Sequence, residues 1–141
     1  MGSSLILTRE DAPAPETVRA FSDGLNSYNA RFFPGADWSP RWLIGRDAAG
    51  EVRSGCRFVF EMDWTFVNWL WIAEPYRRQG EGTRLLNAVE TEARERGKHG
   101  VYLDTFGFQA PLFYPKRGYA EFGRLADFPA GFDRIWFMKR F

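Results

Sequence analysis

Hydrophobic residues recur at two different spacings along this chain. Around residues 15–28 and 82–96 they return every three or four positions, which predicts two amphipathic helices. Elsewhere they alternate with polar residues or run together over short stretches, which predicts strands. The expected strands cover residues 4–8, 42–46, 52–61, 64–73, 101–105, 119–125 and 134–140.

Two of these segments differ in a way that places them in a sheet. In the segment 52–61, Cys56 and Phe58 share one face while Arg53 and Arg57 share the other, which is typical of a half-covered antiparallel strand. The segment 64–73 is apolar on both faces and is therefore expected at the centre of the sheet. With one or two helical turns expected over 110–116, the order of elements predicts a mixed α/β (α+β) fold.

Length and composition limit the organisation and the function. A chain of 141 residues predicts a single domain, residues 1–141. Its 45% hydrophobic and 26% charged residues argue against disorder, and a net charge of +1 argues against nucleic acid as the main partner. One cysteine and one histidine make a metal site improbable. No signal sequence or membrane span is recognised, so we expect a cytoplasmic protein.

The most informative motif is the loop between the apolar strand 64–73 and the helix 82–96. It reads Arg77-Arg78-Gln79-Gly80-Glu81-Gly82-Thr83. Backbone N–H groups at the start of a helix have no acceptor within the helix and can hold an anion such as a phosphate. The loop is not a Walker motif, because no lysine follows either glycine, and it is not a dinucleotide motif, because Leu85 occupies the third glycine position.

This loop resembles the pyrophosphate loop of the GCN5-related N-acetyltransferase superfamily, Arg/Gln-x-x-Gly-x-Gly/Ala, with Arg77, Gly80 and Gly82 at the defining positions. A second resemblance lies in residues 104–119. There a strand is followed by a segment that ends in Phe-Tyr-x-Lys-x-Gly-Tyr. The spacing of the two signatures also fits the superfamily, and the likeness covers residues 42–141.

The resemblance implies an enzyme that transfers an acetyl group from acetyl-CoA to an amine. It also implies a mostly antiparallel sheet of about six to seven strands, flanked by helices, in which the central parallel strands 64–73 and 101–105 splay apart. Tyr114 would protonate the departing thiolate. Backbone groups would hold the pantetheine and pyrophosphate, while Lys116 would reach the phosphate end or be a solvated charge. The implied cofactor-binding residues are Trp71, Ile72, Arg77, Arg78, Gln79, Gly80, Glu81, Gly82, Thr83 and Lys116.

One departure from the family bears directly on mechanism. Many members carry a glutamate where this chain has Asn68, and an amide cannot act as a base. The carboxylates or imidazole that could assist through water are Asp104, Glu61, Glu74 and His99. The family's usual asparagine falls at Gly107, with Gln109 as a possible substitute, and Pro115 would shorten or distort the second helical segment.

Two functions therefore stay open. The first is an N-acetyltransferase that uses direct attack by a small-molecule or peptide amine. The second is a catalytically silent acyl-CoA-binding or interaction domain of the same fold, for which Asn68 is the evidence. The oligomeric state is also open, a homodimer included.

Overall fold

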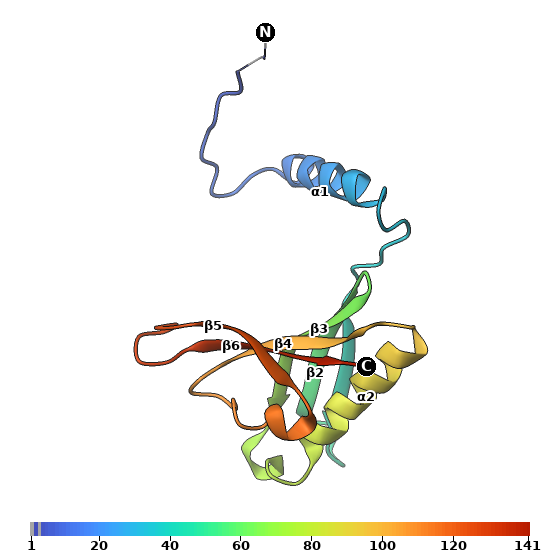
Figure 1. Cartoon of the computed structure of the whole chain (residues 1–141), viewed down its shortest axis with the longest axis vertical. Coiled ribbons are helices and arrows are strands. Elements are labelled where there is room, and N and C mark those ends of the chain that lie inside the picture. The colour runs from blue at the N-terminus through green and yellow to red at the C-terminus, as the bar shows by residue number, and fades with distance from the viewer. Residues whose placement is uncertain (1, 3) are drawn as a thin grey trace. The chain divides into compact units, whose positions relative to one another are not determined.

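A computed structural model describes residue 2 and residues 4–141. The chain divides into two compact units, residues 1–36 and Asp37–Phe141, which we describe separately. Figure 1 labels α1 in the first unit, and α2 and the strands from β2 to β6 in the second. That the whole chain behaves as a single domain stays a prediction.

The described residues of the first unit contain one helix, α1 (Pro15–Asn29), as the sequence predicts. Proline at its first position suits the fixed backbone angle of a helix start. None of its residues is buried, and Phe21 and Leu25 on its apolar stripe are 72% and 63% exposed. The predicted strand over residues 4–8 is wrong, because Leu5, Ile6 and Leu7 form no strand and no described residue pairs with them. An extended segment becomes a strand only when a neighbour supplies the hydrogen-bond ladder.

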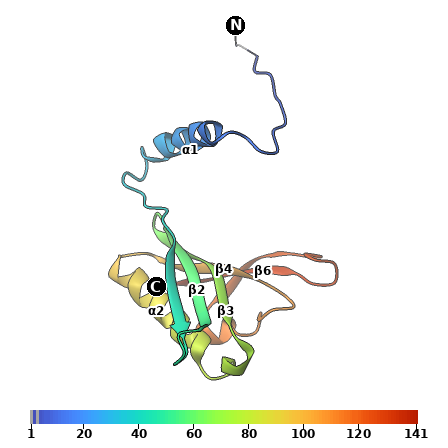
Figure 2. The same cartoon turned by 180° about the vertical axis from the view of Figure 1, so that it is seen from behind.

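The second unit is built on a single sheet of six strands among the described residues. The strands are β1 (Arg41–Arg46), β2 (Val52–Glu61), β3 (Trp64–Ile72), β4 (Gly100–Phe106), β5 (Ala120–Leu125) and β6 (Arg134–Arg140). Their order in the sheet is β1-β2-β3-β4-β6-β5, and Figure 2 shows β1, the unlabelled teal strand, beside β2 and β3. Every neighbouring pair is antiparallel except β3 and β4, which are parallel. The mixed, mostly antiparallel fold is therefore confirmed.

The core lies between this sheet and helix α2 (Glu81–Glu95), which packs on β2, β3 and β4. Val89 and Leu86 of the helix are 0% and 1% exposed, and they meet apolar side chains such as Phe58 of the sheet. Cys56 is also buried in this core, as predicted, and burial raises the pKa of its thiol to about 11. Gly97 follows the helix with a φ of +67°, the left-handed conformation that commonly ends helices.

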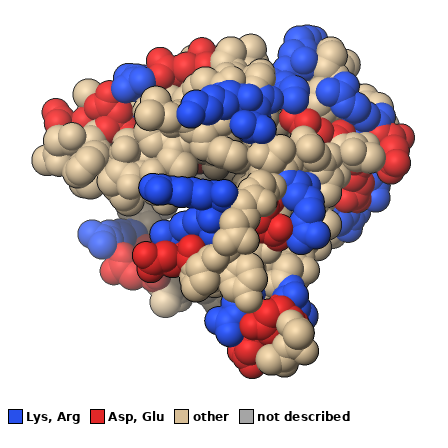
Figure 3. Space-filling view, turned by 90° about the horizontal axis from the view of Figure 1, so that it is seen from below, with Lys and Arg blue, Asp and Glu red and all other residues tan. Residues whose placement is uncertain are grey.

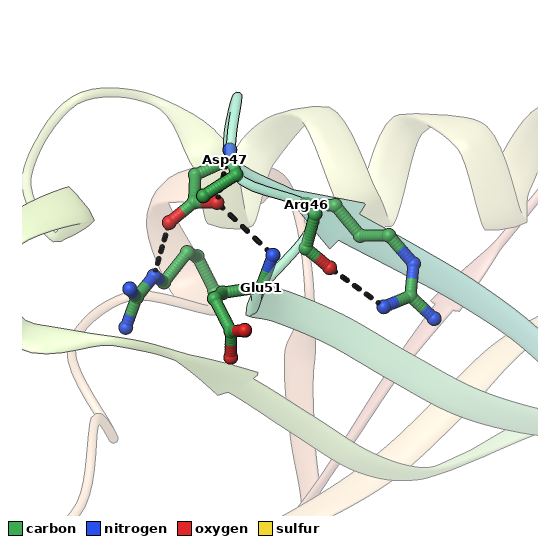
Figure 4. A network of polar contacts seen from close by, with 6 residues as sticks. Arg46, Asp47 and Glu51 are labelled. Atoms are coloured by element: carbon green, nitrogen blue, oxygen red, sulfur yellow. Dashed lines mark hydrogen bonds and ion pairs between the residues drawn. The ribbon is translucent and has the colours of Figure 1, made fainter.

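The turn between β1 and β2 is closed by one aspartate. In the network of Figure 4, the Asp47 carboxylate accepts the backbone N–H groups of Ala49 and Glu51, at 2.9 and 3.0 Å. It also pairs with Arg53 at 2.7 Å, and that hydrogen bond is the first cause of the lowered pKa of Asp47. The hairpin of β1 and β2 is thus fixed by side-chain chemistry of the turn.

The segment after β4 is less helical than predicted. Residues 111–114 form a turn, and the only regular piece recorded within residues 110–117 is a short 3-10 helix, η2 (Pro115–Arg117). Pro115 has no N–H to donate to the carbonyl group four residues earlier, so an α-helix over residues 110–116 cannot close its turn there. The expectation of a distorted helix is confirmed, and its predicted extent is wrong.

Two further features concern the surface. None of the described helices is long and apolar enough to cross a membrane. On the face drawn in Figure 3, basic and acidic side chains interleave rather than forming one continuous field of either sign.

Candidate active site

The central parallel pair of the sheet opens into a fork. The registered partners of β3 and β4 run from Trp64 and Gly100 to Val67 and Leu103 and end there. Beyond that point, β3 continues to Ile72 and β4 to Phe106 without pairing with each other. The predicted splay of the central strands is therefore present.

The cause of the fork lies in a single extra residue. Across β2, Arg57 pairs with Trp69 and Phe58 with Val67, so Asn68 has no registered partner and forms a bulge. A bulge bends its strand and increases the local twist. Because Asn68 directly follows the last parallel pair, the bend comes where β3 leaves β4.

A cleft of about 1250 Å³ occupies this fork. Its walls come from the open halves of β3 and β4, the start of α2 and the segment before η2. The lining residues are Phe66, Asn68, Trp69, Leu70, Trp71, Ile72, Arg77, Arg78, Gly80, Glu81, Gly82, Thr83, Asp104, Thr105, Phe106, Phe108, Gln109, Ala110, Phe113, Tyr114, Arg117 and Arg134.

One end of the cleft is an anion cradle. The first main-chain bond of α2 runs from Arg84 N to Gly80 O at 3.0 Å, so the N–H groups of Glu81, Gly82 and Thr83 have no acceptor within the helix. Gly80 adopts a left-handed φ of +83°, which lets the loop turn sharply into the helix. The positive end of the helix dipole then lies at the cleft wall.

Gly82 and Glu81 show why this cradle can accept phosphate. A Cβ atom on Gly82 would stand 3.0 Å from Phe113 Cζ and 3.3 Å from Ile72 Cδ1, so any larger residue would have to displace these two side chains at the helix start. The Glu81 carboxylate accepts the Ser54 hydroxyl at 2.6 Å and pairs with Arg84 at 2.9 Å. The Arg84 hydrogen bond is the first cause of the lowered pKa of Glu81, and the pairing offsets its negative charge.

Arginines supply the positive charge around the same end. Arg77, Arg78 and Arg117 all line the cleft, and the Arg77 side chain is fixed by a 2.9 Å hydrogen bond to Ile72 O. Guanidinium groups suit phosphate oxygens because they present several N–H donors in a plane. The N–H groups without an acceptor in the helix, the glycines at positions 80 and 82 and the nearby cations together fit the diphosphate of a coenzyme A molecule.

Tyr114 lines the cleft from the segment directly before η2. It is 7% exposed and packs against Phe137 and Tyr119. Burial, followed by the negative charge of Asp104, raises the pKa of Tyr114 to about 12. Tyr102 and Tyr119 both donate to carboxylates, whereas no hydrogen bond of the Tyr114 hydroxyl is recorded among the described residues. Its proton is thus available to a group in the cleft.

Some of the other predicted cofactor-binding residues line the cleft, and others do not. Trp71 and Ile72 line the cleft on the half of β3 that does not pair with β4. Gln79 and Lys116 do not line it, and the Gln79 side chain instead donates to Pro75 O at 2.8 Å. Arg117 lines the cleft instead of Lys116. The sequence patterns did not predict this residue, although it lies within the second signature.

The four predicted base candidates are also separated. Asp104 lines the cleft, whereas Glu61, Glu74 and His99 do not. Glu61 accepts the Tyr102 hydroxyl, and His99 faces Asp63 at 3.9 Å. Gln109, considered as a substitute for the family asparagine, accepts the Phe106 N–H at 3.0 Å and the Thr105 hydroxyl at 3.1 Å, which secures the end of β4.

Comparisons with known proteins agree with this geometry. A model of the acetyltransferase (GNAT) family matches residues 7–119. Acetyltransferase Atu2258 of Agrobacterium fabrum is 31% identical over 131 residues, covering 93% of this chain and 96% of the relative. Blasticidin-S acetyltransferase of Streptomyces morookaense is 36% identical over 83 residues, covering 58% of this chain and 61% of that protein. The crystal structure of an acetyltransferase from Bacillus cereus superposes with a TM-score of 0.82 at 27% identity, covering 95% of this chain and 98% of that one.

The forked parallel pair and the helix start beside it are the features that the family resemblance implies, and the comparisons agree with them. The chain belongs to the acetyltransferase (GNAT) family. It is an acetyl-CoA-dependent N-acetyltransferase, as the sequence predicts.

Proposed function

We propose that this enzyme acetylates the primary amine of a small molecule by direct attack, without an acyl-enzyme intermediate. The observation that carries the proposal is the fork itself. It brings the anion cradle, the half of β3 that does not pair with β4 and the Tyr114 hydroxyl to one cleft. A cleft that holds an amine and a thioester side by side raises their effective concentration and so speeds their reaction.

Each wall of the cleft has a separate task in this proposal. Acetyl-CoA supplies a thioester whose carbonyl carbon accepts an amine and whose sulfur departs as a thiolate. The N–H groups of Glu81, Gly82 and Thr83, with Arg77 and Arg78, hold its diphosphate. Backbone groups near Trp71 and Ile72, on the half of β3 that does not pair with β4, bind the pantetheine amides in the manner of an added strand.

Tyr114 acts as the general acid. Its phenol stays protonated at neutral pH because its pKa is raised to about 12. A group that holds its proton until charge develops on sulfur is suited to protonate a departing thiolate.

Direct attack is supported by the state of the only cysteine. Cys56 lies in the core under α2, and the raised pKa of its thiol keeps it protonated. A buried thiol is a poor nucleophile, because the thiolate is the reactive form.

A small-molecule acceptor is supported by the named relative that acetylates blasticidin S, although the match covers 58% of this chain. Thiol release from acetyl-CoA should be measured with a panel of amines that includes blasticidin S and an N-terminal peptide amine. We expect turnover with at least one small-molecule amine. Tight acetyl-CoA binding without thiol release for any amine would favour the catalytically silent binding domain.

A further inference from the structure

The proposed reaction so far assigns no residue that binds the acceptor amine. A primary amine is mostly an ammonium ion at neutral pH and must lose a proton before it can attack. An ammonium group has three N–H donors, so a site for it should offer oxygen acceptors that the protein itself leaves unused.

Two such oxygen atoms lie where the fork begins. Asn68 and Asp104 are the first residues of β3 and β4 beyond the last parallel pair, and both line the cleft. Asn68 Oδ1 is buried and has no hydrogen-bond partner among the described residues. Burying a polar atom without a partner is unfavourable, so this oxygen is left to accept a donor that enters the cleft.

Asp104 offers a charge in the same place. Its Oδ1 atom accepts Arg134 Nε at 2.8 Å, and no contact is recorded for Oδ2 among the described residues. The Asp104 side chain is 13% exposed, so the carboxylate is largely withdrawn from solvent. A carboxylate with one bound and one free oxygen is fixed in direction and can still accept a donor.

Arg134 is itself held in place, which fixes the Asp104 carboxylate in turn. Its guanidinium carbon lies 5.3 Å from the ring centre of Phe106, 5.2 Å from that of Phe128 and 5.0 Å from that of Trp136. These cation–π contacts orient the guanidinium from several sides. Two phenols also interact with the charge of Asp104. Burial is the main cause of the raised pKa values of Tyr114 and Tyr102, and the negative charge of Asp104 raises both further.

We propose that Asp104 binds the ammonium group of the acceptor and takes its proton, with Asn68 Oδ1 as the second acceptor of that ammonium. This inference rests on the proposed function and assigns the class of acceptor, a primary ammonium. Asp104 removes one proton, and the freed nitrogen lone pair forms the C–N bond while the C–S bond breaks. Tyr114 gives its proton to the sulfur and regains one from the new amide nitrogen. Asp104 releases its proton to solvent.

Binding tests this assignment without any need for turnover. The probes are benzylamine, charged at pH 7, and benzyl alcohol, which has a similar shape without the charge. Each is titrated into the CoA-saturated protein and followed by the side-chain amide signals of Asn68 in NMR spectra. We expect benzylamine to bind wild type at least about tenfold more tightly than it binds Asp104→Asn. Benzyl alcohol should bind both alike.

The matched control is Asp133→Asn, because Asp133 also pairs with an arginine, Arg124, but does not line the cleft. It should bind benzylamine like wild type. Retained CoA affinity shows that a variant is folded. Equal benzylamine affinity in wild type and Asp104→Asn would overturn the proposal, as would wild-type binding of benzylamine no tighter than of benzyl alcohol.

A pH profile distinguishes proton removal from a structural effect. With an amine that turns over, Asp104→Asn should lower kcat/KM at least about tenfold at pH 7 and by less at pH 9. The gap narrows because the amine loses its proton to solvent without help at high pH. A loss of the same size at both pH values would contradict proton removal by Asp104. Failure of the proposed function would look different, since benzylamine would bind wild type through Asp104 while no amine released thiol.

Discussion

The two halves of β3 have the same strand geometry and opposite surroundings. From Trp64 to Val67 the strand pairs with β2 on one side and β4 on the other, and Thr65 and Val67 are 0% and 4% exposed. From Trp69 to Ile72 it pairs with β2 alone, and Trp69 and Trp71 are 63% and 51% exposed. The closed half belongs to the core and the open half lines the cleft.

The difference shows how one bulge can divide stability from function within a strand. Asn68 lies at the boundary, as the residue without a registered partner on β2 and the first residue beyond the last pair with β4. A ladder that continued past Asn68 would pair all of β3 and leave no fork for a ligand. Substitutions in the closed half should therefore change folding, and substitutions around the open half should change binding or turnover.

The largest effect is expected where the open half meets the helix start. In Gly82→Asp, the new side chain would crowd Phe113 and Ile72 and add a negative charge to the diphosphate cradle. We expect acetyl-CoA to bind about 100-fold more weakly or worse, measured by calorimetry. Gly24→Asp is the control, because a Cβ at Gly24 in α1 meets nothing within 4 Å. Unchanged affinity in a folded Gly82→Asp protein would exclude this helix start from the site.

The next effect concerns turnover alone. Tyr114→Phe keeps the packed ring and removes the hydroxyl, so kcat should fall by about 100-fold while the acetyl-CoA dissociation constant stays the same. Stopped-flow and steady-state thiol release measure this with any amine that reacts. Tyr119→Phe is the control, because the Tyr119 hydroxyl is committed to Glu90 at 3.1 Å. A wild-type rate in Tyr114→Phe, with acyl transfer limiting turnover, would mean that the thiolate leaves without this acid.

The closed half should behave in the opposite way. Val101 pairs with Thr65 and is 0% exposed, so Val101→Ala removes buried methyl groups and should lower the free energy of unfolding by about 2 kcal/mol. Trp69→Ala in the open half should cost much less, since its side chain is already largely exposed. Urea unfolding measures both. Acetyl-CoA affinity should survive Val101→Ala, and a large loss of affinity would mean that the two halves are coupled.

The smallest effect is a change in titration. The pKa of Tyr114 is raised to about 12, whereas an unfolded tyrosine ionises near pH 10. Because the folded state favours the neutral phenol, the contribution of Tyr114 to the free energy of unfolding is fully present below about pH 10. It is lost as the pH rises from about 10 to about 12. Ultraviolet titration of wild type minus Tyr114→Phe should show one phenol ionising near pH 12. A difference curve centred near pH 10 would show that Tyr114 is solvated.

Sequence patterns predicted the second unit well because its elements carry their own signals. The apolar stripe of α2, the two-sided apolar run of β3 and the loop glycines are all local features, and the family resemblance then implied the splayed strands. The strand over residues 4–8 failed because an apolar triplet cannot show whether a partner strand exists. Asp104 could be named as one of several candidate bases, but its pairing with Arg134 depends on the contact between β4 and β6, thirty positions apart in the sequence.

The central claim is that acetyl-CoA lies in the fork, against the open half of β3 and the start of α2. Hydrogen exchange of backbone amides, with and without saturating acetyl-CoA, measures this directly. We predict slower exchange in residues 69–72 and 79–83, and unchanged exchange in Trp64–Val67 and in the paired part of β4. Tight binding without added protection in both of these segments, or with protection centred on another part of the chain, would contradict the account.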